Sequence, residues 1–96
     1  MTVQVRLEAE QDIRDAIQWY ESREASLGQM VIEEIDAAFG RIEAGPERYP
    51  LSYRNLRRAL VRRFPYAIYF VNDGSRIEII AVLHQRRDLA LIDERD

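Results

Sequence analysis

The chain has no cysteine and no lysine, and only one histidine among its 96 residues. The lack of cysteine excludes a disulfide framework, a thiolate metal site and a cysteine nucleophile, and nothing in the composition requires an oxidising compartment. His84 alone, without a spaced carboxylate motif around it, supplies too few ligands for a metal site. We therefore expect neither a metal nor any other cofactor.

Long apolar runs are missing as well. No run approaches the roughly 18 residues that a membrane span needs, and the segment 1–5 lacks the basic and apolar regions of a signal peptide. We therefore expect a cytoplasmic protein with no membrane partner. The four glycines are too scattered for a phosphate-binding loop, and no serine lies in a nucleophile elbow. With 32% charged and 47% hydrophobic residues, the length predicts one globular domain over residues 1–96.

The net charge of −3 conceals an uneven distribution along the chain. Residues 1–47 contain four arginines and eleven carboxylates, a net charge of −7. Residues 48–87 contain nine arginines and two carboxylates, a net charge of +7, and residues 88–96 return to −3. All 14 basic residues are arginine, whose planar fork of donors suits phosphates and carboxylates. The middle of the chain is therefore strongly basic.

The densest part of this basic segment lies between residues 54 and 63, and two more arginines follow the last apolar run. The arginines that we single out as candidate contacts are Arg54, Arg57, Arg58, Arg63, Arg86 and Arg87. Like charges at this density repel one another, which favours a partner that neutralises them, either nucleic acid or an acidic protein segment. A genomic bias toward arginine combined with a solvated strand surface is the alternative explanation.

Helical and strand-like periodicities alternate along the chain. Residues 3–7 alternate apolar and polar residues, as in a short strand, and residues 9–24 and 27–44 have apolar residues at helical spacing. Ser26 is a plausible helix cap and Gly28 permits a tight corner between the two helices. The aromatic residues Trp19, Tyr20 and Phe39 lie on these helices, and we expect them to pack.

Three strands are predicted after Pro50, over residues 55–60, 66–71 and 77–83. The sequence Asn72-Asp73-Gly74-Ser75 is typical of a hairpin turn between the last two strands, since aspartate and glycine tolerate positive φ. Residues 89–96 are expected to add a helical turn or to fray. The order β-α-α-β-β-β predicts an α+β fold in which an antiparallel sheet packs against an N-terminal αα-hairpin.

Metal-free RNA cleavage is the one hydrolytic chemistry that the residue inventory permits. Arginine can stabilise the charge that develops on the phosphate while histidine or tyrosine moves protons. The candidate groups are His84, Arg57, Arg63, Arg87, Tyr66 and Tyr69. Tyr66 and Tyr69 are three residues apart on one strand and must lie on opposite faces, so they do not line one pocket. A structural role for His84, bonding to the end of its strand, is the alternative.

The order of short motifs over residues 9–88 resembles the RelE/ParE superfamily of type II toxins. The motifs are Trp19-Tyr20-Glu21, Gly45-Pro46 with Tyr49-Pro50, Arg63-Phe64-Pro65-Tyr66-Ala67-Ile68-Tyr69, and Val82-Leu83-His84-Gln85-Arg86-Arg87-Asp88. The resemblance implies the same α+β fold and a cognate antitoxin as partner.

Two positions separate the branches of that superfamily. RelE-like members cleave messenger RNA on the ribosome with an arginine after the first tyrosine of the Tyr-rich strand, where this chain has Ala67. Their C-terminal tyrosine would fall near Leu91, which has no hydroxyl group. ParE-like members, which poison DNA gyrase and have no identified hydrolytic site, do not need these groups. The resemblance therefore implies a ParE-like toxin whose target is DNA gyrase.

Two other functions remain open at this point. One is a ribosome-dependent endoribonuclease acting on mRNA, with His84, Arg63 and Arg87 as working groups. The other is a non-toxic protein-binding module that keeps the fold and its contacts. Under the leading hypothesis, Arg54, Arg57, Arg58 and Arg63 would contact both the antitoxin and the target, which would explain neutralisation.

Overall fold

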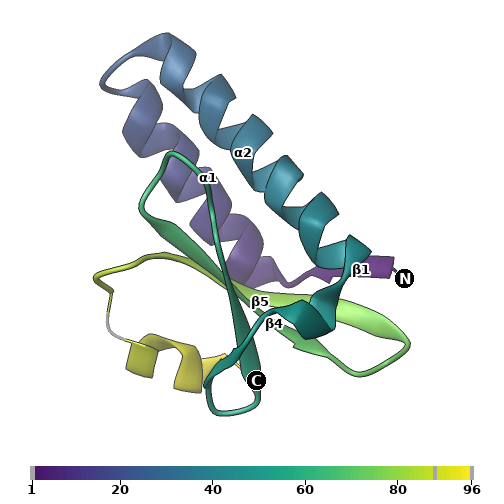
Figure 1. Cartoon of the computed structure of the whole chain (residues 1–96). Helices are drawn as coiled ribbons and strands as arrows, with labels where there is room; N and C mark the ends of the chain where they lie inside the picture. The colour runs from purple at the N-terminus through teal and green to yellow at the C-terminus, as the bar shows by residue number, and fades with distance from the viewer. Residues whose placement is uncertain (1, 88, 96) are drawn as a thin grey trace.

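Two α-helices, five strands and two short 3-10 helices are formed in the computed structural model, which describes residues 2–87 and 89–95. Their order along the chain is β1 (Thr2–Val5), α1 (Leu7–Glu21), α2 (Ala25–Ala44), η1 (Pro46–Arg48), β2 (Leu51–Tyr53), β3 (Leu56–Leu60), β4 (Tyr66–Asn72), β5 (Arg76–His84) and η2 (Leu89–Glu94). The predicted α+β architecture, with an N-terminal αα-hairpin on a sheet, is confirmed (Figure 1). Asp88, which ends the last sequence motif, and Asp96 lie outside the described residues.

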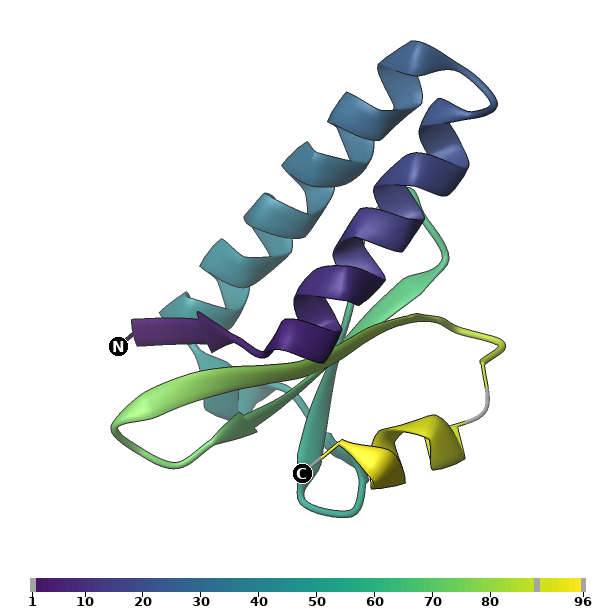
Figure 2. The same ribbon diagram turned by 180° about the vertical axis from the view of Figure 1, so that it is seen from behind.

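The αα-hairpin forms because both helices have an apolar stripe facing the sheet. Ala9 and Ala16 of α1 and Val31, Ile35 and Ile42 of α2 are almost fully buried. Such a stripe needs another apolar surface to cover it, and the sheet supplies that surface. Figure 2 shows the two helices side by side across one side of the sheet. Tyr20 and Phe39 pack against this core as predicted.

Three details of the helices differ from prediction. Ser26 is no cap: α2 begins at Ala25, two residues before the predicted start, and its N-cap residue Glu24 makes no side-chain cap bond. Gly28 lies inside α2, where a Cβ would collide with the Glu21 side chain, so glycine permits close helix contact rather than a corner. The Trp19 side chain is 49% exposed, because it lies on the outer side of α1. The Arg23 guanidinium covers its ring at 3.4 Å from the centroid.

The strand order in the sheet is β1-β5-β4-β3-β2. The β3–β4 and β4–β5 pairs are antiparallel, and the predicted turn joins the latter pair. The prediction of an antiparallel sheet is wrong at one edge, because β1 pairs with β5 in parallel. The helical hairpin and the following strands separate β1 from β5 along the chain, and a connection of this length allows parallel neighbours.

The sequence pattern did not reveal the fifth strand. One strand was predicted over residues 55–60, but the structure forms two after Pro50, β2 and β3, which are separated at Arg54 with φ +55°. Asp93, far away in sequence, accepts hydrogen bonds from both Tyr53 and Arg54, at 2.9 Å each. A long-range contact therefore holds a turn for which arginine has little intrinsic preference.

The sheet separates two apolar clusters. The helix-side cluster contains Ile68, Phe70, Ile77, Ile79 and Val82, together with the buried helix residues. The outer cluster contains Ala67, Tyr69, Ile80 and Leu83 and is covered by Ile92 of η2, which is 4% exposed. Residues 89–94 therefore form a docked 3-10 helix rather than a frayed end (Figure 1).

Candidate functional site

The predicted contact arginines of β3 do not share one surface. Arg57 lies on the helix side of the sheet, beside Phe70, and its Nη1 donates to the Tyr49 carbonyl oxygen at 2.5 Å. Arg58 lies on the outer side, where its Nε donates to the Tyr69 hydroxyl at 3.3 Å. Consecutive strand residues point to opposite faces, so adjacency in sequence separates these two guanidinium groups in space.

The remaining predicted arginines are spread further. The Arg54 Nε lies 2.9 Å from the Asp93 carboxylate on the outer side, and the interactions with Tyr53 and Asp93 raise its pKa. Arg63, at φ +72°, follows β3 and lies 3.4 Å from Glu34 of α2. Arg86 and Arg87 follow the end of β5 and are exposed. The six arginines therefore form several separate sites and not one basic surface.

Two of the groups considered for RNA cleavage, His84 and Tyr66, lie side by side. His84 pairs with Tyr66 across β4 and β5, and their ring centroids are 5.5 Å apart. The Tyr66 ring in turn lies 6.3 Å from that of Tyr20. The His84 Nδ1 accepts a hydrogen bond from the Arg86 backbone N–H at 3.1 Å, which agrees with the structural role considered for this histidine. Burial raises the pKa of Tyr66, and the nearby Tyr20 and Asp15 act in the same direction against the opposing effect of Arg87.

Two of the other candidates, Tyr69 and Arg63, have their described contacts with other residues. Tyr69 lies on the outer side of the sheet, opposite Tyr66, as predicted. The Arg63 side chain pairs with Glu34 of α2. Over residues 2–87 and 89–95 there is no group of three or more residues placed to hold a metal ion.

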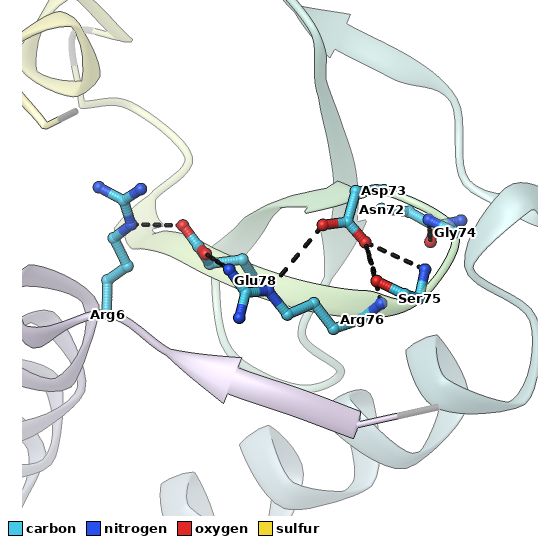
Figure 3. Close-up of polar contacts among 7 residues, drawn as sticks. All are labelled: Arg6, Asn72, Asp73, Gly74, Ser75, Arg76 and Glu78. Atoms are coloured by element: carbon cyan, nitrogen blue, oxygen red, sulfur yellow. Dashed lines mark hydrogen bonds and ion pairs between the residues drawn. The ribbon is translucent and has the colours of Figure 1, made fainter.

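A cavity of about 430 Å³ lies on the outer side of the sheet, next to η2. Arg6, Asp73, Glu78, Asp93 and Arg95 are among its lining residues. Figure 3 shows cationic partners of two lining carboxylates. Arg6 Nε lies 2.5 Å from Glu78, and Arg76, which is not itself a lining residue, lies 3.9 Å from both Glu78 and Asp73. The Asp93 carboxylate forms its ion pair with Arg54.

The carboxylate of Asp73, at the tip of the β4–β5 hairpin, is held by hydrogen bonds within the turn. It accepts bonds from the backbone N–H groups of Arg76 and Ser75, which lower the pKa of its carboxyl group (Figure 3). The carboxylates that line the cavity therefore all have cationic or hydrogen-bonding partners within the protein, and the cavity presents no uncompensated charge of one sign.

A second surface groove differs from this cavity in the charge of its lining residues. It is an open groove of about 910 Å³ at the free edge of the sheet, and we call it the edge groove. Its lining residues are Arg41, Arg48, Tyr49, Pro50, Leu51, Ser52, Arg58, Leu60 and Arg62. Four arginines and no carboxylate line it. Arg41, Arg48 and Arg62 were absent from the candidate contacts predicted from the sequence. Arg62 lies in the dense arginine segment but was not singled out, whereas Arg41 and Arg48 lie outside it. The spacing of seven residues between Arg41 and Arg48 around the end of α2 is the sequence signal that could have placed these two together.

The comparisons with known proteins agree with this fold. Residues 3–89 match the family described as "ParE toxin of type II toxin-antitoxin system, parDE". The chain belongs to the ParE toxin family. A solved structure described as "Chromosomal ParDE TA system from P. aeruginosa" is similar to this ParE-family chain with a TM-score of 0.78 and 15% sequence identity. The similarity covers 88% of this chain and 95% of the other, and at this identity it establishes the fold alone. The comparison with curated proteins gives no match.

The family assignment confirms the resemblance seen in the order of sequence motifs. The ParE-family chain is thus a toxin of a type II toxin–antitoxin system. Within its described residues, no helix is both long enough and apolar enough to cross a membrane.

Proposed function

We propose that this ParE-family toxin acts in the cytoplasm as a single domain that binds and inhibits DNA gyrase, without chemistry of its own, and that a cognate antitoxin neutralises it. The main support is Ala67. This residue occupies the position at which the RNA-cleaving branch has its catalytic arginine, and its side chain is 0% exposed within the outer cluster. An arginine at this position would have to bury its charge among apolar side chains, at a high cost in free energy.

The surroundings of His84 support the same proposal. The imidazole Nδ1 accepts a backbone hydrogen bond, Arg63 pairs with Glu34, and Arg87 lies in the exposed segment after β5. Leu91 supplies no hydroxyl group near the chain end. General acid–base catalysis requires groups within hydrogen-bond reach of a common substrate atom, and the described ion pair of the Arg63 side chain is with Glu34 rather than with the His84–Tyr66 pair.

The proposed antitoxin would have to reach both sides of the sheet. Arg57 and Arg63 are on the helix side, whereas Arg54 and Arg58 are on the outer side. A segment that runs from the αα-hairpin around the β2–β3 edge would pass both pairs. Extended segments commonly bind by following a sheet edge in this way.

The experiment compares expression of the chain alone with expression together with the adjacent gene. We expect growth arrest by the lone chain, relief by the neighbour, inhibited supercoiling by purified gyrase and accumulation of cleaved DNA. Normal supercoiling together with cleaved messages, lost in His84→Ala and Arg87→Ala, would favour the ribosome-dependent endoribonuclease instead. Harmless expression of the folded chain would point to the non-toxic binding module.

A further inference from the structure

The edge groove combines uncompensated positive charge with exposed apolar surface. Arg41 comes from the last turn of α2, Arg48 from η1, Arg58 from β3 and Arg62 from the segment after it. Among the described residues, none of these four makes an ion pair with a carboxylate. Arg48 donates only to the backbone carbonyl oxygens of Gly45 and Arg41, at 3.4 Å each, and these neutral acceptors leave its charge in place.

Two leucines are exposed in the same groove. The Leu51 side chain of β2 is 62% exposed and that of Leu60 of β3 is 50% exposed. About half or more of each side chain is therefore left uncovered by the protein itself. A surface that places apolar side chains beside arginines matches the composition of protein interfaces, in which arginine is enriched around an apolar centre.

The end of β3 near Leu60 has backbone groups that face away from β4 and are not paired with β2. β2 pairs with β3 only through Tyr53–Leu56 and Leu51–Arg57, and one further bond runs from the Arg58 N–H to the Pro50 carbonyl oxygen at 3.1 Å. In an antiparallel sheet, backbone groups two residues apart point to the same side. The N–H and C=O of Leu60 therefore point, like those of Arg58, to the β2 side of β3. β2 begins only at Leu51, and no strand of the described residues lies beside Leu60 on that side.

From these three features we propose that the edge groove binds an extended acidic segment of a partner protein. The segment pairs with the open edge of β3 beside Leu60, its carboxylates contact the groove arginines, and separate apolar side chains cover Leu51 and Leu60. Guanidinium groups bind carboxylates through paired, charge-assisted hydrogen bonds. Strand addition supplies backbone bonds, and alternate side chains supply specificity.

A nucleic acid is the less suitable occupant. Phosphates would satisfy the arginines, but they would leave the exposed leucines and the open backbone groups of β3 without partners. An acidic segment with alternating apolar residues matches all three. The proposal rests on the proposed function only for the origin of the segment, which we assign to the antitoxin.

The test measures binding of labelled synthetic peptides to the full chain by fluorescence anisotropy. The probe is a peptide of alternating glutamate and leucine, and it is compared with a glutamate–serine peptide, a lysine–leucine peptide and a single-stranded thymidine oligonucleotide. We expect the glutamate–leucine peptide to bind most tightly and its affinity to fall as salt rises. Amide NMR shifts should concentrate at Leu51, Leu60 and Arg62.

Matched variants locate the site. Arg41→Glu/Arg62→Glu should weaken binding of the glutamate–leucine peptide at least about tenfold, as loss of two charge-assisted contacts predicts. The control Arg14→Glu/Arg23→Glu changes the net charge equally, at exposed positions outside the groove that are not among the candidate contacts, and should weaken binding less than about twofold. Leu60→Ser should lower the affinity for the glutamate–leucine peptide and leave the affinity for the glutamate–serine peptide unchanged. Circular dichroism and thermal unfolding establish that each variant is folded.

Three results would overturn the proposal: no binding of the glutamate–leucine peptide, equal losses in the groove and control variants, or tighter binding of the oligonucleotide that is insensitive to Leu60→Ser. Failure of purified antitoxin to compete with the peptide would overturn the assignment of the segment to the antitoxin. Because these measurements involve neither gyrase nor growth, a negative result here leaves the proposed toxicity intact, and a negative supercoiling assay leaves the groove intact.

Discussion

Asp12 of α1 and Arg95 near the chain end form a nearly buried bidentate ion pair beside β5. The Arg95 Nη1 and Nη2 atoms lie 2.5 and 3.0 Å from the two carboxylate oxygens, and the side chains are 15% and 11% exposed. Hydrogen bonding to Asp12 raises the pKa of Arg95. The same carboxylate accepts the Val82 N–H at 3.0 Å, and Arg95 also donates to the Ile80 carbonyl oxygen at 3.3 Å.

A β-bulge explains why this pair is placed there. Phe70 pairs with Ile79 and Tyr69 with Ala81, so Ile80 is an extra residue in β5. A bulge disrupts the ladder and leaves backbone groups without strand partners. The Asp12–Arg95 pair bonds to the carbonyl oxygen of the bulged Ile80 and to the N–H of Val82 two residues later, and so it connects α1, β5 and the docked C-terminal segment.

Removal of Asp12 should therefore destabilise the protein strongly. We expect Asp12→Ala to lower the free energy of unfolding by about 2–3 kcal/mol, because both Arg95 and the Val82 N–H lose their partner in a mostly dry site. Urea denaturation measures the loss. Asp15→Ala on the same helix removes an exposed carboxylate bonded to Gln11 and should cost about 0.5 kcal/mol or less. Equal losses in the two variants would contradict the role assigned to the pair.

Two glycine substitutions should have opposite effects. Gly74 has φ +91° in the β4–β5 turn, and Gly74→Ala should destabilise by about 1–2 kcal/mol because a Cβ is strained in that conformation. Gly40 lies in α2, and a Cβ added there would meet no other atom within 4 Å. Gly40→Ala should stabilise by about 0.8–1.0 kcal/mol, the difference in helix propensity. Thermal unfolding of both variants checks the signs, and destabilisation by Gly40→Ala would show that the helix has less room than the structure indicates.

Tyr66 should make the stability decrease at alkaline pH. Burial raises the pKa of its phenol above the ordinary value of 10.0, so the folded state favours the neutral form. The resulting stabilisation is complete below the pKa of the unfolded chain and is lost as the pH rises through the higher folded value. We expect Tyr66→Phe to reduce the fall in unfolding temperature above about pH 10. Parallel profiles for wild type and variant would contradict this assignment.

His84 should be dispensable for toxicity. Loss of a general acid or base normally reduces a rate by about 10²–10⁴-fold, whereas a toxin that acts by binding has no such step. Growth arrest by His84→Ala, measured over a titration of inducer, should therefore remain within about threefold of wild type. His84→Gln, which preserves hydrogen-bonding capacity at the end of β5, separates a loss of stability from a loss of chemistry. Abolished toxicity in both folded variants would contradict a purely binding mechanism.

The periodicity of the sequence was sufficient for the helices, the β4–β5 hairpin and the order of layers. These elements depend on local patterns: apolar residues at helical spacing in residues 27–44, a nearly continuous apolar run in residues 66–71, and turn residues between the last strands. The motif order was likewise sufficient for the family, since the positions of Tyr66, Ala67 and His84 are properties of the sequence itself.

Features that depend on contacts between residues far apart in the sequence were decided only by the tertiary structure. The split between β2 and β3 depends on Asp93, the docked chain end depends on Asp12, and the parallel pairing of β1 depends on the path of the chain around the helices. The charge distribution gave a basic middle segment but not its geometry. Strand alternation separates Arg57 from Arg58, while folding brings Arg41 and Arg48 beside Arg58 and Arg62, because a side chain's neighbours across a sheet edge are set by chain topology rather than by distance along the sequence.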